Sequence, residues 1–286
     1  MRRVNGFSTS AMVVFVSILY LLSISCGSAS SKSTAPDNDG AEQRVEGGSY
    51  DEAQMGNEVF DELKAKRSII QESPMYDPLK AVVDPIARTI QPRYEYPLKF
   101  YLIHDADANA FTASAGNVYI TDELLYATKT NDELAGVICH EVAHAVNHDS
   151  VELMEKREQI WRRGIAAELL LGRTRGKALA ILFLGHLNSL GYSREVEEKA
   201  DLDGADICAE AGHNPWGLIW FFGNYAGNDR AQMPEVLSDH PDHKSRIEAL
   251  EKHFRRNSSK FGKFNSDRRS ATTFAVPEKA SVVFMR

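Results

Sequence analysis

Two histidines and a glutamate lie at a spacing that could hold and use a metal ion. Residues 140–144 read His-Glu-Val-Ala-His, an HExxH pattern. On an α-helix, positions i and i+4 share one face, so His140 and His144 could direct both imidazoles at one ion. Zinc accepts nitrogen ligands in a tetrahedral site, and a catalytic site leaves one position open for water. We predict that Glu141 is the general base that takes a proton from this water.

The residues around this motif predict the helix that it requires. Thr130 and Glu133 have the spacing of a capping box, in which side chains satisfy the first free backbone N–H groups of a helix. A half-buried helix is therefore expected. The alternative is that the two histidines are ordinary surface residues, which leaves the grouping of His, Glu and His beside two small alanines without a reason. Apolar side chains recur at helical intervals, at Leu134, Val137, Ile138, Val142 and Ala145.

A third protein ligand is needed, and no histidine at the close spacing of the metzincin pattern follows His144. The best candidate lies on a second predicted helix, which begins near Tyr192 and ends before Gly212. Glu197 and Asp201 are again i and i+4, so Glu197 could reach the metal while Asp201 accepts the other ring N–H of a ligand histidine. Small residues that would let the two helices pack closely follow at Gly204, Ala205 and Cys208.

Taken together, these motifs resemble those of the HtpX- and BepA-like zinc metallopeptidases, peptidase family M48. Members carry HExxH, then ExxxD on a second helix that Tyr-Ser-Arg often introduces, and later His-Pro followed by Arg-Ile. This sequence has each of them, at residues 140–144, 192–201, 240–241 and 246–247. A further likeness runs from Asn109-Ala110-Phe111 through Gly116 to residues 118–121. The resemblance covers roughly residues 50–255.

The resemblance implies a fold and a set of residue roles. The fold would be α+β and predominantly helical, a zincin-like metallopeptidase with a small sheet beside the HExxH helix. Zn²⁺ would be the cofactor, with Glu197 as its third ligand and Asp201 supporting a ligand histidine. His240 would hydrogen-bond the oxyanion or fill the fourth position of zinc in a latent state, and Arg246 would help to hold that region in place. An extended polypeptide substrate would bind by backbone hydrogen bonds to an outer strand, with Asn109, Phe111 and Gly116.

The remaining pattern predicts the elements that would position this site. An apolar stretch at residues 178–190 is too short to span a bilayer, which needs about 20 residues, so we expect a buried or lid-like helix there, with a surface that leans on a membrane as the alternative. Other expected elements are helices at about residues 50–67 and 77–89, a strand at 98–103 and a hairpin at 110–121.

The first residues predict export. Arg2 and Arg3 precede an apolar run, which is followed by small residues and Cys26. We predict a signal peptide at residues 1–25, a lipidated Cys26 as in bacterial lipoproteins, and a flexible linker at 26–48. Ser23 stands where such signals usually have Leu, so ordinary cleavage further on and retention as an N-terminal anchor stay open as alternatives. We place the metallopeptidase domain at residues 49–256 and a flexible C-terminal tail at 257–286.

Composition narrows the function classes. The chain has 286 residues, of which 43% are hydrophobic and 26% charged, as in ordinary globular proteins. Its formal net charge is -7, and it has no basic stripe or Gly-rich phosphate loop, so we expect no nucleic-acid partner. Cys139 and Cys208 fall within the two predicted metal helices, where we expect buried packing residues and no disulfide.

These features predict an exported zinc metalloendopeptidase of the periplasm or bacterial cell envelope. Its substrates would be misfolded or unfolded polypeptides, and Cys26 would attach it to a membrane. Two alternatives stay open. One is a chaperone-like quality-control protein with latent or no proteolysis, which the presence of Glu141 disfavours. The other is a structural zinc protein in which His240 permanently closes the metal site.

Overall fold

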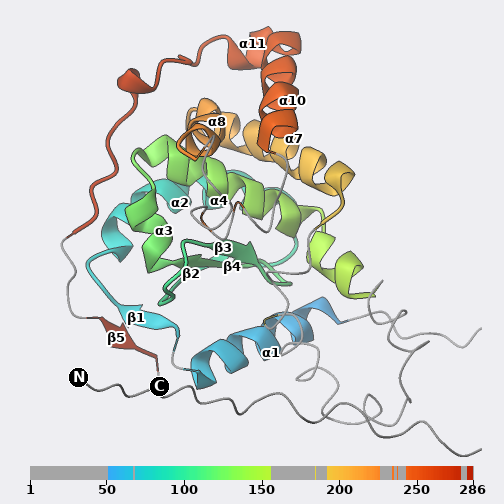
Figure 1. The fold of residues 1–286 in the computed structure, drawn as a ribbon. Coiled ribbons are helices and arrows are strands. Elements are labelled where there is room, and N and C mark those ends of the chain that lie inside the picture. The colour runs from blue at the N-terminus through green and yellow to red at the C-terminus, as the bar shows by residue number, and fades with distance from the viewer. Residues whose placement is uncertain are drawn as a thin grey trace, which may run out of the picture. The chain divides into compact units, whose positions relative to one another are not determined.

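A three-stranded sheet supports the central helices of the protein (Figure 1). The computed structural model describes residues 51–66, 68–155, 184, 192–225, 234, 237, 243–277 and 282–285. The sheet has the order β2-β4-β3, in which β4 pairs parallel with β2 and antiparallel with β3. Its strands are β2 (Lys99–Ile103), β3 (Ala110–Thr112) and β4 (Asn117–Thr121). The predicted strand and hairpin are therefore present, and Ala115 and Gly116 make the hairpin turn with φ values of 59° and 75°.

Helices make up most of the described chain, as expected for the predicted fold class. The first two, α1 and α2, match the two predicted helices to within a few residues. Residues 149–155 are also helical. The helices are α1 (Glu52–Ala65), α2 (Tyr76–Ile90), α3 (Asp122–Ala127), α4 (Asn131–Val146), α7 (Arg194–Ala211), α8 (Trp216–Gly223), α10 (His243–Arg256) and α11 (Ser258–Phe261), with short 3-10 turns at Gln91–Arg93 and Arg268–Ser270.

Both faces of the sheet are covered, which explains why every residue of β4 is buried. Successive side chains of a strand point to opposite faces. Val118 and Ile120 enter a large hydrophobic core that includes residues of α2, α4 and α7. Tyr119, between them, enters a second core with Phe111 and with apolar residues of α1. The sheet therefore separates α1 from the metal helix α4.

Helix α4 lies between the sheet on one side and α7 and α8 on the other (Figure 1). Close packing requires glycine at several contacts. A Cβ at Gly204 of α7 would lie 3.0 Å from the backbone of His140, and one at Gly136 would lie 2.5 Å from the backbone of Leu218. The expected close approach through small residues is thus present. The expectation of a half-buried helix is wrong, because these neighbours bury every residue from Glu133 to Ala145.

The segment after Asn257 differs from the flexible tail expected from its weak periodicity. Its described residues pack against the rest of the chain through two buried aromatic side chains, Phe261 and Phe274. The backbone N–H of Phe274 donates to the carbonyl of Lys129, and Arg268 forms an ion pair with the buried Glu133. Strand β5 (Val283–Phe284) then pairs antiparallel with β1 (Ile70–Glu72). Single, widely spaced residues such as Phe261, Arg268 and Phe274 hold this segment. Because they do not recur at a regular interval, hydrophobic periodicity does not reveal them.

Several predicted features lie outside the described residues. They are the signal peptide, Cys26, the linker, the apolar stretch at 178–190 apart from Leu184, and His240. Within the described ranges, no helix is both long and apolar enough to cross a membrane.

Candidate metal centre

Helix α4 begins as its sequence predicts. The side chain of Thr130 accepts the backbone N–H of Glu133 at 3.1 Å, and the carboxylate of Glu133 accepts the backbone N–H of Lys129 at 2.8 Å. Reciprocal side-chain bonds of this kind satisfy the first free donors of a helix. The helix then continues without interruption through His140, Glu141 and His144.

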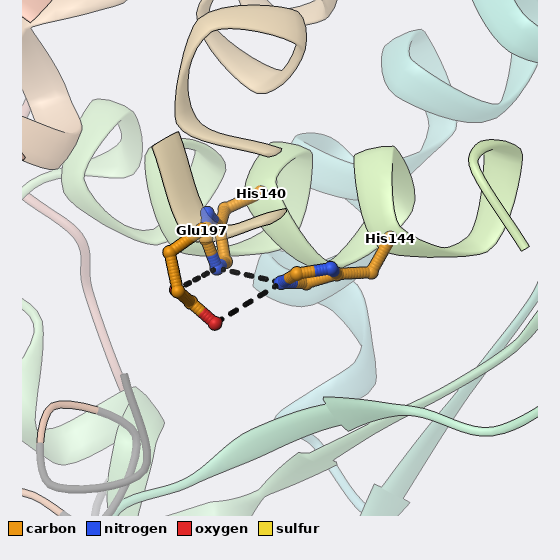
Figure 2. Close-up of side chains that lie close together, drawn as sticks. All are labelled: His140, His144 and Glu197. Atoms are coloured by element: carbon orange, nitrogen blue, oxygen red, sulfur yellow. Dashed lines mark hydrogen bonds and ion pairs between the residues drawn. The ribbon is translucent and has the colours of Figure 1, made fainter. Parts of the chain in front are cut away.

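His140, His144 and Glu197 converge from two helices (Figure 2). The two Nε2 atoms lie 3.1 Å apart, and Glu197 places its carboxylate oxygens 3.5 Å from Nε2 of His140 and 3.8 Å from Nε2 of His144. All three side chains are buried. Two imidazole nitrogens and one carboxylate are a common ligand set of catalytic zinc. The residues present therefore fit a metal ion.

Each histidine is held at its other nitrogen by a carboxylate. Nδ1 of His140 lies 2.9 Å from Asp201, and Nδ1 of His144 lies 2.8 Å from Asp149. A carboxylate only accepts hydrogen bonds, so each Nδ1 carries the proton and each Nε2 presents its lone pair to the centre. This second set of contacts sets the tautomer that a metal-binding histidine needs.

Charge state favours ligation as well. Burial lowers the pKa of His140 to about 3, against the opposing effect of its hydrogen bond to Asp201. The imidazole is therefore neutral at neutral pH, which is the form that binds metals.

Arg246 of α10 contacts both acidic residues that α7 contributes to the centre. Its guanidinium donates to both carboxylate oxygens of Asp201, at 2.6 and 2.7 Å, and lies 3.4 Å from Glu197. Burial alone would raise the pKa of Asp201, but the charge and hydrogen bonds of Arg246 lower it to about 2. The guanidinium also stacks over the ring of Phe222, with 4.7 Å to the ring centroid. Two residues predicted to support the ligands, Asp201 and Arg246, thus contact each other and the ligands.

Glu141 lies in the same buried environment. Its backbone carbonyl accepts the hydroxyl of Thr112 at 2.6 Å, which ties α4 to β3. Burial raises the pKa of Tyr192, and the nearby acidic residues Glu141, Asp149 and Glu197 raise it further. Glu141 therefore acts electrostatically on the residues around the centre.

Asp149 was not among the residues predicted for the site. Helix α4 ends at Val146, and His148 adopts a left-handed φ of 58° in the turn that follows. Asp149 returns toward His144 as a result. His148 is not part of the metal centre, because its Nδ1 pairs with Glu52 of α1 at 2.8 Å. A non-glycine residue with positive φ is not visible as a pattern in the sequence.

The strand predicted to bind substrate is an edge strand of the described sheet. Phe111 stacks on Tyr119 at 5.1 Å and belongs to the core on the α1 side. The carbonyl of Asn109 accepts the backbone N–H of Thr121 in β4, and Gly116 forms the turn. The residues nearer to α4 are their neighbours, Ala110 and Thr112.

Cys139 and Cys208 form a disulfide between α4 and α7, with Cα atoms 5.8 Å apart. The expectation of two separate packing residues is therefore wrong. Both side chains are buried, as predicted. The sequence does not predict this pairing, because 69 residues separate the two cysteines and no short-range motif connects them. The cross-link joins the helix that carries the histidines to the helix that carries Glu197.

A buried HExxH helix, a carboxylate on a second helix that could complete a metal site, and a small sheet beside them are the features of a metallopeptidase of the zincin-like, α+β class. Comparison with known proteins agrees. The model of peptidase family M48 matches residues 77–253. The chain belongs to this family, which confirms the predicted resemblance and the predicted fold class.

Curated relatives share modest identity with the chain. It is 27% identical over 162 residues to the beta-barrel assembly-enhancing protease of Yersinia pestis, and 25% identical over 162 residues to that of Escherichia coli strain K12. Each match covers 53% of this chain and 33% of the relative, so the chain spans about a third of their length. It is also 28% identical over 225 residues to the mitochondrial metalloendopeptidase OMA1 of Danio rerio, which covers 70% of this chain and 45% of that protein.

Proposed function

We propose that this protein is a zinc-dependent endopeptidase of the bacterial cell envelope that hydrolyses misfolded or unfolded polypeptides. The observation that carries the proposal is the convergence of two Nε2 atoms and the Glu197 carboxylate, with each Nδ1 already held by a carboxylate. Relatives named as proteases and metalloendopeptidases support the peptidase activity.

The mechanism follows from what each residue can do. When bound, zinc would supply the Lewis acidity that polarises the scissile carbonyl and acidifies the attacking water. Glu141 accepts the proton of this water and delivers it to the leaving amine. Asp149 and Asp201 keep the two histidines in the tautomer that leaves Nε2 free, and Arg246 orients Asp201. His240 donates to the oxyanion in this proposal, as the family motif implies.

An exported location is supported by two features of the chain. The N-terminal residues read as a signal peptide ending before Cys26. The Cys139–Cys208 disulfide suits an oxidising compartment, because cytosolic proteins rarely keep structural disulfides. Relatives named for beta-barrel assembly come from bacteria, whereas the OMA1 relatives are mitochondrial. Lipidation of Cys26 would anchor the protein to a membrane, and mass spectrometry of the mature N-terminus tests it.

The decisive experiment measures zinc content and casein hydrolysis side by side for the native protein, Glu141→Gln and Glu197→Ala. We expect Glu141→Gln to keep its zinc and lose hydrolysis, since it removes the base and leaves the ligands. Glu197→Ala should lose much of both, because it removes a ligand. Glu198→Ala is the matched control, since it removes an exposed carboxylate from the next position of the same helix.

Two results would reject the proposal. Full zinc occupancy in Glu197→Ala would remove this residue from the ligand set. Casein hydrolysis that survives in Glu141→Gln would remove the proposed base. If the native protein binds zinc and suppresses aggregation without cleaving, the chaperone-like alternative is correct. If His240→Ala turns an inactive native protein into an active one, the centre is latent.

A further inference from the structure

Tyr192 connects the metal centre to the edge strand of the sheet. This residue lies two positions before α7, the helix that carries Glu197. Its ring stacks on the imidazole of His144, with centroids 4.3 Å apart and planes inclined by 18°. Its hydroxyl lies 3.2 Å from Oγ of Ser150, which follows Asp149 in the chain. His144 is therefore held by Asp149 at Nδ1 and by Tyr192 on its face.

The direction of the hydrogen bonds can be assigned. Oγ of Ser150 lies 2.9 Å from the carbonyl oxygen of Thr112 in β3, and a carbonyl can only accept. Ser150 must therefore donate its single hydroxyl proton to Thr112. Its oxygen then accepts from the phenol of Tyr192. The resulting chain runs from Tyr192 through Ser150 to the backbone of β3.

This series of hydrogen bonds ends at the outer edge of the sheet. The carbonyl of Asn109 accepts from Thr121, and the N–H of Ala113 donates to Asn117, so odd-numbered residues of this segment bond to β4. Strand geometry then directs the backbone groups of Ala110 and Thr112 away from β4. These are the groups that an added strand would use. Ser150 thus fixes one carbonyl of the edge, on a residue whose side chain also bonds to the backbone of Glu141.

We propose that Tyr192 and Ser150 are positioning residues that hold the substrate edge of β3 in register with the metal ligand His144. This inference rests on the proposed peptidase function. The ring of Tyr192 would act on the metal side by fixing the plane of His144. Its hydroxyl would act on the substrate side, through Ser150, by fixing the carbonyl of Thr112. The two parts of one side chain therefore have separable effects.

The first experiment needs no peptidase activity. Zinc affinity is measured by chelator competition for the native protein, Tyr192→Phe and Tyr192→Leu. We expect Tyr192→Phe to bind zinc within about twofold of the native protein, because the stacked ring remains. Tyr192→Leu should bind about tenfold more weakly, as is typical when a group that orients a ligand is lost. Equal affinity in all three proteins would overturn the inference, whether or not the protein cleaves peptides.

The second experiment measures kcat and KM on an unfolded polypeptide for Tyr192→Phe, Ser150→Ala and the double variant. Loss of one hydrogen bond should lower kcat/KM by roughly two- to tenfold, with unchanged zinc content. Since both residues act through one chain, the double variant should be no worse than the more damaged single variant. Additive losses, or native kinetics in Tyr192→Phe, would overturn the inference.

Tyr101→Phe is the matched control. Its ring belongs to the core on the opposite face of the sheet, so it should leave both zinc affinity and kinetics unchanged. Urea unfolding of every variant separates positioning from stability. A fall in kcat/KM that only follows a fall in the free energy of unfolding would assign Tyr192 a structural role and overturn the inference. If the native protein shows no hydrolysis at all, the proposed function fails, and the zinc-affinity experiment still decides the part played by the ring.

Discussion

Removing the Cys139–Cys208 disulfide should cost a large part of the stability of the protein. The bond closes a loop between positions separated by 69 residues. The chain-entropy relation for a loop of this length gives about 4 kcal/mol of stabilisation, through restriction of the unfolded chain. This is a substantial fraction of the roughly 5–15 kcal/mol that holds typical proteins folded. The double variant Cys139→Ala/Cys208→Ala tests the value without placing a hydroxyl in two buried positions.

Urea unfolding of the native protein and the double variant measures the difference in free energy of unfolding. We expect about 4 kcal/mol in non-reducing buffer. In reducing buffer the two proteins should agree to within about 1 kcal/mol, since only small packing differences then remain. Cys26→Ala serves as the control, because it removes the third cysteine and should leave the midpoint unchanged.

Two results would refute this reasoning. A difference below about 1 kcal/mol in non-reducing buffer would mean that the cross-link does not restrict the unfolded chain. Thiol titration in denaturant that finds Cys139 and Cys208 free in freshly purified protein would mean that the bond does not form. A reduced protein that still binds zinc would show that packing of α4 on α7 suffices to assemble the ligands.

Further predictions follow from single contacts. Asp149→Asn should weaken zinc binding by about 10- to 100-fold, because His144 loses its charged orienting partner, whereas the exposed Asp107→Asn should not change it in the same chelator competition. Gly204→Ala should lower the free energy of unfolding by about 1–3 kcal/mol, because its Cβ would lie 3.0 Å from the backbone of His140. Denaturant unfolding measures this difference. Gly223→Ala is the control, since its Cβ would meet nothing within 4 Å. Tyr119→Phe should leave the stability unchanged or raise it by about 1 kcal/mol, because the buried hydroxyl has no hydrogen-bond partner within the described residues; a clear loss of stability would contradict this. Burial raises the pKa values of Tyr94 and Tyr119. Their contribution to stability is therefore fully present below the ordinary tyrosine pKa of about 10 and falls above it by about 1.4 kcal/mol per pH unit for each residue. Denaturant unfolding between about pH 9 and 11 should show a weaker pH dependence in Tyr94→Phe than in the native protein, and an equal dependence would contradict this.

Local spacing made the metal centre predictable. Two i and i+4 pairs form it, on helices whose caps are visible in the sequence: His140 with His144, and Glu197 with Asp201. Regular helix geometry places the two members of each pair on one face of their helix. The two helices also had to meet, and the small residues of α7 indicated the face on which they would. The predicted hairpin and the first two helices follow from the same short-range patterns.

The features that were missed depend on contacts between distant parts of the chain. Asp149 reaches His144 only because His148 takes a left-handed conformation. The partners of Cys139 and Phe274 lie far along the chain, where no periodicity connects them. Strand β3 lies at the edge of the described sheet, and its register places Phe111 in the core on the α1 side, which the alternation of the sequence alone does not decide.

The complete enclosure of α4 has a consequence for how long a metal would stay. The residues of α4 from Glu133 to Ala145 have no solvent-exposed face, so this part of the helix cannot unfold locally without exposing the core. Its amide hydrogens should therefore exchange with deuterium only when the whole core opens. A metal ion held by His140 and His144 should therefore dissociate slowly while the chain is folded. The protein would then keep its bound metal through short periods in which free metal is scarce.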